Sequence, residues 1–312
     1  MTSEKFGKVV KGLGGLYETR IDGEGGERLV CRAKGVLHRD DAKLLIGDNV
    51  RISVDTDTPD GIVISEIMPR KNALIRPPMA NLDYIFIVFA ATKPAPVLET
   101  VDKMISIAMH NGIVPVVIIT KSDLDFDEAQ RLCDIYTASD IAAFVTSSED
   151  SSGLSEVSAY IKKHVASGKT AAFAGASGVG KSTLMNALFP SLMLATAEIS
   201  RKIERGRHTT RHVEIFDIGE GEATGFLADT PGFSLIDFAR FDFFSLDELL
   251  PSFPDLIKYT GKCRYADCAH VGEGAEDCAV ARAAEEGKIM KTRLESYRSI
   301  YKVLKEKNTY AK

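Results

Sequence analysis

The chain has 312 residues, of which 45% are hydrophobic, and its 39 basic and 44 acidic side chains give a net charge of −5. This length exceeds one typical domain, and the composition is that of an ordered globular protein rather than a disordered one. No apolar stretch approaches the length that spans a bilayer, and Met1–Leu13 lacks a hydrophobic signal core, so we expect a cytoplasmic protein without a membrane partner.

Residues 1–70 carry short alternating runs separated by turns such as Gly25-Gly26 and Asp60-Gly61. Alternation with turns at this spacing predicts a small β-barrel, and we expect it to be of the OB-fold type. The proline-rich stretch from Pro69 to Pro78 marks the end of this barrel.

One predicted strand of the barrel, Arg28–Lys34, has a basic face. Alternation places its apolar side chains on one side of the strand and Arg28, Arg32 and Lys34 on the other with Val30. A basic strand face suits an RNA phosphate backbone. A solvated strand face is the alternative, because few aromatic side chains for base stacking occur here.

A sheet begins after this boundary. Leu82–Ala91 is a nearly continuous apolar run, which is typical of a parallel strand buried on both faces. The following run, Val97–Asn111, has the spacing of a helix with one core-facing stripe. Two further apolar runs, Val114–Ile119 and Ile141–Val145, predict two more strands.

The first of these two strands ends in Thr120, Lys121, Ser122 and Asp123. A carboxylate at Asp123 would accept hydrogen bonds from N1–H and the exocyclic amine of guanine, whereas adenine would leave it unpaired. Lys121 can lay its aliphatic stem over the base. After the second strand, a backbone N–H at Ser147 could meet guanine O6. A solvated turn is the alternative for the lysine and aspartate taken singly.

A phosphate-binding loop follows these guanine-recognition residues in the chain. It lies between a predicted strand, Thr170–Ala174, and a predicted helix that starts near Thr183. Its residues fit G-x-x-x-x-G-K-[ST] and are Gly175, Ala176, Ser177, Gly178, Val179, Gly180, Lys181 and Ser182, with Thr183 next. The glycines let backbone N–H groups approach phosphate oxygens at a helix N-terminus. Lys181 would reach the β- and γ-phosphates and Ser182 would ligate Mg²⁺; an incidental glycine-rich turn is the alternative.

Two later segments predict the remaining magnesium and γ-phosphate contacts. The strand Gly225–Ala228 leads into Asp229 and Gly232. We expect Asp229 to hold Mg²⁺ through water and the Gly232 N–H to meet the γ-phosphate. Thr210, in the polar loop 206–210, could complete the metal shell only when the γ-phosphate is present, which would make this loop a switch. A simple turn is the alternative for Asp229-Thr230-Pro231-Gly232.

Three thiols and one imidazole lie close together near the other end of the chain, at Cys263, Cys268, His270 and Cys278. Three thiolates and a neutral imidazole make a closed tetrahedral zinc site of the structural type. Disulfides are the alternative, although the chain has only five cysteines and no signal peptide. The run from Ala279 to about Lys307 is helical in pattern and rich in lysine.

These motifs and their order resemble the ribosome small-subunit-dependent GTPase A family, RsgA, over nearly the whole chain. The resemblance implies an OB-like β-barrel at 1–70, a circularly permuted P-loop GTPase domain at 71–234 and a zinc-binding, mainly helical domain at 235–312. It also implies a monomer that hydrolyses GTP to GDP, stimulated by the 30S ribosomal subunit and its 16S rRNA, in late maturation of that subunit. The chain departs from the family pattern at Thr120, where Asn is usual, and at Arg211.

The expected mechanism is in-line attack of water on the γ-phosphoryl group, with Lys181, Mg²⁺ and backbone amides stabilising the charge. Phe233 occupies the place where many GTPases have a water-orienting glutamine. His208 is the best remaining candidate for the catalytic polar group, and the resemblance supports it; a solvated loop histidine is the alternative. Intrinsic turnover should therefore be slow.

Charge is unevenly distributed along the chain. It sums to −8 over residues 71–256 and to +4 over residues 257–312. We therefore expect focused basic contacts with RNA and a salt-sensitive complex. A P-loop kinase and a nucleotide-independent RNA-binding module remain as alternative functions. Because Asp229–Gly232 leads directly toward the zinc-binding segment, we hypothesise that nucleotide state sets the orientation of that segment.

Overall fold

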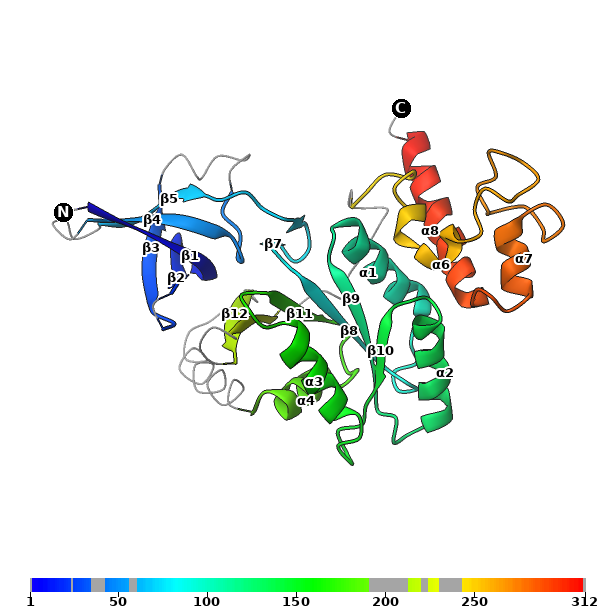
Figure 1. The fold of residues 1–312 in the computed structure, drawn as a ribbon, viewed down its shortest axis with the longest axis horizontal. Coiled ribbons are helices and arrows are strands. Elements are labelled where there is room, and N and C mark those ends of the chain that lie inside the picture. The colour runs from blue at the N-terminus through cyan, green and yellow to red at the C-terminus, as the bar shows by residue number, and fades with distance from the viewer. Residues whose placement is uncertain are drawn as a thin grey trace. The chain divides into compact units, whose positions relative to one another are not determined.

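The computed structural model describes residues 2–23, 25–34, 43–55, 61–190, 213–219, 224–229 and 243–310, without the side chains of residues 2, 55, 229 and 308–310. Figure 1 shows the fold. The described residues form two compact units. The first unit lies within Met1–Tyr84, Ala159–Phe173 and Phe189–Phe233, and the second within Ile85–Ser158, Ala174–Leu188 and Ser234–Lys312.

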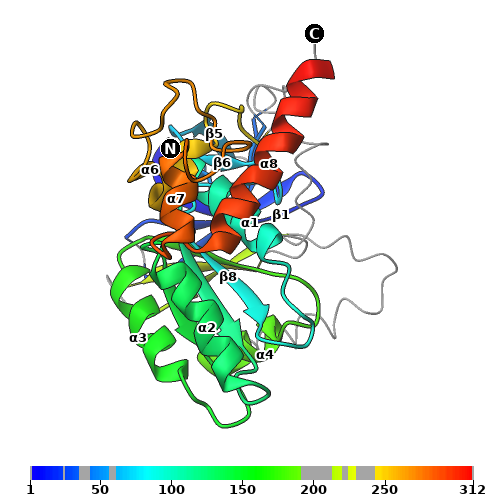
Figure 2. The ribbon, with the colours of Figure 1, turned by 90° about the vertical axis from the view of Figure 1, so that its right-hand side faces the viewer.

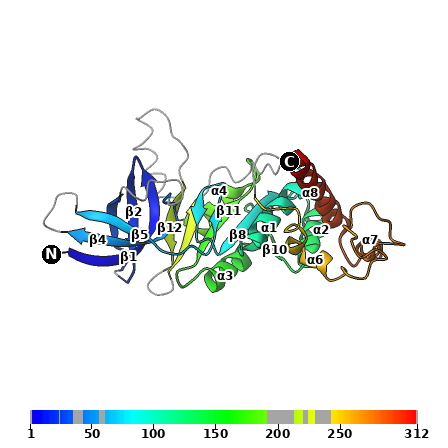
Figure 3. The same cartoon turned by 90° about the horizontal axis from the view of Figure 1, so that it is seen from above.

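The N-terminal part of the first unit is a closed five-stranded barrel (Figure 3). The strand order is β1-β2-β3-β5-β4, with β3 and β5 parallel, which confirms the predicted OB-like barrel. Its core contains Val9, Ile21, Cys31, Val50 and Ile64, all nearly inaccessible to solvent. The strands are β1 (Thr2–Leu13), β2 (Leu16–Ile21), β3 (Arg28–Ala33), β4 (Asn49–Asp55) and β5 (Ile62–Ile67).

A short antiparallel pair, β6 (Ala73–Leu74) and β7 (Met79–Ala80), follows the barrel. The larger sheet then has the order β10-β9-β8-β11-β13-β12. Pairing is parallel for β10 with β9 and for β11 with β13, whereas β12 is antiparallel to β13. The strands are β8 (Tyr84–Ala90), β9 (Val114–Thr120), β10 (Ala142–Val145), β11 (Thr170–Ala174), β12 (Glu214–Ile218) and β13 (Gly225–Asp229).

Apolar strands of this sheet form where the sequence predicts them. Every residue of β8 and β11 is buried, as expected for strands covered on both faces. The helices that follow the strands are α1 (Leu98–His110), α2 (Phe126–Thr137), α3 (Leu154–His164) and α4 (Lys181–Leu188). Asp125 caps α2, since its carboxylate accepts a hydrogen bond from the Glu128 N–H.

The C-terminal segment contains two helices where the sequence pattern predicts one continuous run. The short elements η4 (Leu250–Ser252) and α6 (Pro254–Ile257) precede α7 (Ala279–Glu285) and α8 (Lys291–Tyr310). Gly287, between α7 and α8, has a left-handed φ of 71°, which ends the first helix. Figure 2 shows α8 beside α1, with which it is in contact. No helix in the described part of the chain is both long and apolar enough to cross a membrane.

The basic face of β3 is partly occupied inside the first unit. Arg28 forms ion pairs with Glu18 on β2, at 3.0 Å, and with Asp217 on β12, at 3.2 Å. Arg20 on β2 also pairs with Asp217, at 2.7 Å, and Lys11 on β1 pairs with Glu214 at 2.9 Å. Arg28 therefore joins the barrel to β12, while Arg32 stays exposed on the outer strand face.

Lys8 on β1 is a buried cation in the same region. Its Nζ lies 5.4 Å from the centre of the Phe226 ring on β13 and 3.5 Å from the Gly47 carbonyl oxygen. Burial lowers the pKa of Lys8 to about 8, and nearby carboxylates such as Asp83 only partly oppose that shift. The barrel thus contains a lysine that loses its proton more readily than an exposed one.

This depressed pKa makes stability depend on pH. Between about pH 8 and the ordinary lysine pKa of 10.5, the unfolded chain binds more protons at Lys8 than the folded chain, so stability rises with pH. The Lys8→Met variant lacks this dependence. We expect the stability of the parent relative to Lys8→Met to rise by about 2 kcal/mol between about pH 7 and 10 in urea unfolding. If the free energies of unfolding of the parent and of Lys8→Met changed with pH in parallel, the depressed pKa of Lys8 would be contradicted. Lys163→Met changes an exposed lysine and is the control, whose curve should run parallel to that of the parent.

Candidate nucleotide site and metal centre

The loop between β11 and α4 has the backbone that a phosphate-binding loop needs. Gly175, Gly178 and Gly180 have φ values of 154°, 79° and 92°, which favour glycine. A Cβ at Gly175 would lie 2.2 Å from the Val88 carbonyl oxygen, so this position has no room for a side chain. The loop leads into the N-terminus of α4, where unpaired N–H groups favour an anion.

The predicted phosphate-binding and magnesium-binding side chains begin α4. Lys181 is half-buried, and its Nζ lies 3.3 Å from the Gly175 carbonyl oxygen, across the mouth of the loop. Ser182 and Thr183 are exposed, as are Ala176 and Ser177 in the loop. This arrangement leaves the loop open to a phosphate chain from the solvent side.

A hydrogen bond joins this loop to the predicted guanine-recognition residues. The buried Thr120 hydroxyl contacts the Val179 carbonyl oxygen and lies 3.2 Å from the Phe89 carbonyl oxygen. A hydroxyl has one proton, and Val179 is the nearer acceptor, so it receives that proton. Thr120 therefore connects the two loops despite replacing the usual Asn.

Lys121 makes a second connection between the same loops. Its Nζ donates to the carbonyl oxygens of Gly178, at 2.7 Å, and Lys93, at 2.5 Å. The residue has a left-handed φ of 58°, which turns the chain sharply after β9. The lysine stem consequently extends across the site toward the phosphate-binding loop.

Asp123 is exposed and is oriented by a buried serine. The Ser147 hydroxyl donates to Asp123 Oδ1 at 2.7 Å, while the Ser147 N–H donates to the Ser152 carbonyl oxygen at 3.1 Å. Ser122 is buried, and its N–H donates to the Thr146 carbonyl oxygen. Ser147 thus contacts the candidate site through its side chain, and the sequence pattern did not indicate this bond.

The described residues contain only part of the predicted switch and magnesium positions. His208, Thr210 and Gly232 lie outside them, and Asp229 is described only as the last residue of β13. The structure therefore brings together the phosphate-binding loop, the segment from Thr120 to Asp123, and Ser147.

The four predicted zinc ligands meet in one cluster that could hold a metal ion. Their ligand atoms all lie within 4.8 Å of one another. His270 Nδ1 lies 3.4 Å from the sulfurs of Cys268 and Cys278 and 3.6 Å from that of Cys263. A tetrahedral zinc with ordinary bond lengths separates its ligand atoms by roughly 3.5 to 3.8 Å. The donor set and its spacing fit such an ion.

Protein groups around the cluster favour its use as a metal site. Burial lowers the pKa of His270, which keeps its imidazole neutral near neutral pH. The sulfurs of Cys263 and Cys278 accept hydrogen bonds from the N–H groups of Ala279 and Ala281, at 3.4 Å each. Cys278 is also the N-cap of α7. All five cysteines are free of disulfides.

Comparison with known proteins identifies relatives of this arrangement. Residues 67–239 match a family model described as RsgA GTPase, and residues 6–63 match one described as RsgA N-terminal domain. A protein named small ribosomal subunit biogenesis GTPase RsgA from Agathobacter rectalis is 35% identical over 97% of this chain and 99% of its own. A protein of the same name from Alkaliphilus metalliredigens is 37% identical over 97% of this chain and 99% of its own.

Solved structures agree with these matches. The crystal structure of YjeQ from Thermotoga maritima is 29% identical, has a TM-score of 0.75, and covers 97% of this chain and 99% of its own. YloQ, described as a circularly permuted GTPase, is 31% identical with a TM-score of 0.74, covering 97% and 96%. The expected fold, a permuted GTPase with an N-terminal barrel, is confirmed.

The bridging hydroxyl of Thr120 gives a test of the site. Thr120→Val keeps the shape but leaves the Val179 carbonyl without its donor, which should cost about 1 to 2 kcal/mol of guanine-nucleotide binding, or roughly 5- to 30-fold in affinity. Thr120→Ser should stay near the parent. Titration with a fluorescent GDP analogue measures this, with the exposed Thr137→Val as control; equal affinities for Thr120→Val and the parent would contradict the assigned bridge.

Proposed function

Since the chain belongs to the RsgA GTPase family and is therefore a GTP-hydrolysing enzyme, we propose that the 30S ribosomal subunit stimulates its activity and that it acts in late maturation of that subunit. The observation that favours this function most is the hydrogen-bonded junction of Thr120 with Val179, because it holds a base-recognition segment against a phosphate-binding loop. We expect the enzyme to contact the 16S rRNA of the 30S subunit and to act in the cytoplasm. We expect the enzyme to act as a monomer.

Guanine recognition in this proposal depends on Asp123. Its carboxylate accepts two hydrogen bonds from the base, and the Ser147 hydroxyl fixes the carboxylate orientation. Because the Ser147 N–H already donates to Ser152, we assign the contact with guanine O6 to a neighbouring backbone N–H and keep Ser147 as a positioning residue. Lys121 lies along the base with its stem and donates to Gly178 with its ammonium group.

Phosphate binding depends on the loop from Gly175 to Thr183. Backbone N–H groups of the loop bind the phosphate oxygens, and Lys181 turns from the Gly175 carbonyl toward the β- and γ-phosphates. We propose that Ser182, Thr210 and Asp229 hold Mg²⁺, the metal that neutralises phosphate charge in such enzymes. Gly232 is the proposed γ-phosphate contact.

The cluster of Cys263, Cys268, His270 and Cys278 is proposed to hold one structural zinc ion. Three thiolates and an imidazole fill a tetrahedral shell and leave no position for water, so this metal stabilises the fold and takes no part in hydrolysis. The ion would fix a loop that has few apolar contacts of its own.

The first experiment compares hydrolysis of GTP and ATP with and without 30S subunits. We expect GTP to be preferred by at least about 100-fold, because adenine leaves Asp123 unpaired. Asp123→Asn should lose this preference for GTP and gain one for xanthosine triphosphate, whose O2 accepts from the new amide. Asp127→Asn, an exposed change on α2, is the control.

Equal use of ATP and GTP would contradict guanine recognition and favour a kinase-like function. Indifference to 30S subunits would contradict the ribosomal part alone. RNA binding without any nucleotide effect would favour the nucleotide-independent module.

The proposed role of His208 has its own test. His208→Ala should lower the 30S-stimulated rate about 100-fold or more, because no glutamine is present at Phe233 to orient water. GDP affinity should be unchanged, which separates a catalytic from a binding role. His164→Ala, on α3, is the control. A stimulated rate equal to that of the parent would rule the histidine out.

A further inference from the structure

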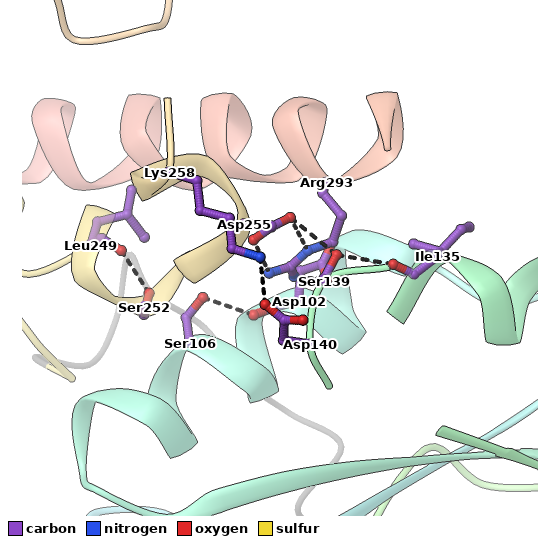
Figure 4. Close-up of polar contacts among 10 residues, drawn as sticks. All are labelled: Asp102, Ser106, Ile135, Ser139, Asp140, Leu249, Ser252, Asp255, Lys258 and Arg293. Atoms are coloured by element: carbon purple, nitrogen blue, oxygen red, sulfur yellow. Dashed lines mark hydrogen bonds and ion pairs between the residues drawn. The ribbon is translucent and has the colours of Figure 1, made fainter. Parts of the chain in front are cut away.

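The second unit contains a buried charged cluster that neither nucleotide nor metal binding uses. Figure 4 shows its members: Asp102 from α1, Ser139 after α2, Asp255 from α6 and Arg293 from α8, together called the Arg293 cluster. The exposed fraction of Arg293 is 0%, and those of Asp102, Ser139 and Asp255 are 1%, 1% and 4%. Three elements, α1, α6 and α8, therefore meet at one guanidinium group, and Ser139 joins them through Asp255.

The bonds of the cluster satisfy the charges closely. Arg293 Nη1 donates to Asp102 Oδ1 at 2.5 Å, while Nε and Nη2 donate to the two oxygens of Asp255 at 3.2 and 3.1 Å. The Ser139 hydroxyl lies 3.1 Å from Asp255 Oδ2 and 2.9 Å from the Ile135 carbonyl oxygen, so its one proton is shared between these two acceptors. The guanidinium also lies 4.5 Å from the centre of the Phe253 ring. A lysine could not reach both carboxylates with such a fork.

The same helix, α8, holds the metal-binding loop. One turn beyond Arg293, the Tyr297 hydroxyl donates to the Ala269 carbonyl oxygen at 3.1 Å, and Arg298 donates to the His270 carbonyl oxygen at 3.0 Å. Tyr297 packs edge to face on Phe253, with ring centres 5.5 Å apart. Loss of the metal would loosen this loop and, with it, the packing of α8.

Two other members of the Arg293 cluster, Ser139 and Asp102, belong to segments that lead to the guanine-recognition residues. Helix α2 starts at Phe126, shortly after Asp123, and ends at Thr137, shortly before Ser139. Helix α1, which carries Asp102, follows the loop in which the Lys93 carbonyl accepts from Lys121. Both helices that frame the base-recognition residues are thus held by the Arg293 cluster.

We propose that Arg293 couples the metal site to the nucleotide site, so that bound metal tightens GDP binding and bound GDP slows metal release. This inference depends on the proposed zinc site and on guanine-nucleotide binding. It also restricts the hypothesis that the zinc-binding segment reorients with nucleotide state, because movement against α1 would separate buried opposite charges.

The test measures both binding events on the full chain, with Zn²⁺ and a fluorescent GDP analogue as probes. We expect removal of Zn²⁺ by a chelator to weaken GDP binding about fivefold or more. Because coupling is reciprocal, saturating GDP should raise the affinity for Zn²⁺ by the same factor. In Arg293→Lys both factors should fall to about one while each ligand still binds. Arg131→Lys, which changes an exposed arginine with a bidentate partner, Glu128, should keep the parent coupling.

A second variant covers the case in which Arg293→Lys does not fold. The triple change Asp102→Asn, Arg293→Met and Asp255→Asn leaves no buried charge unpaired and should fold without coupling. GDP affinity that is unchanged by Zn²⁺ removal in the parent would overturn this inference alone, as would full coupling in both variants. A chain that binds GDP but holds no Zn²⁺ would overturn the zinc proposal and the inference with it, and a chain that binds no GDP would overturn the proposed function as well.

Discussion

The hydrogen bond from Thr120 to the Val179 carbonyl is the contact on which the nucleotide site depends. It joins residues 59 positions apart, one at the end of β9 and one in the loop after β11. This bond requires only that the two loops lie close together, whichever of them comes first in the chain. This explains physically why a permuted order preserves the site: its loops recognise each other through buried polar atoms rather than through sequence neighbours.

Opposite charges from distant parts of the sequence pair inside each unit. The acidic middle of the chain supplies Asp217 to Arg28 of the barrel, and Asp102 to Arg293 of the basic C-terminal segment. Part of the charge that the sequence suggests for RNA contact is therefore used within the protein. Arg32 on β3 and Lys302 and Lys305 on α8 are exposed to solvent.

Local sequence patterns predicted most of the fold, whereas hydrogen bonds between residues far apart in the sequence could not be predicted from them. The strand Thr170–Ala174 was predicted with its observed bounds, because apolar runs and loop glycines are local features. The bond between Ser147 and Asp123 leaves no periodic trace. A signal for Arg293 does exist, since it shares the helical spacing of Tyr297, Ile300 and Leu304, all buried, so it stands on the apolar stripe of α8.

The position of Arg293 late in the chain has a consequence for synthesis. Translation proceeds from the N-terminus, so α1 leaves the translating ribosome long before Arg293, which pairs with the Asp102 carboxylate in the core. Until then the carboxylate stays hydrated and α1 cannot complete its packing. The packing of α1 against α8 is therefore completed only when almost all of the chain has been made.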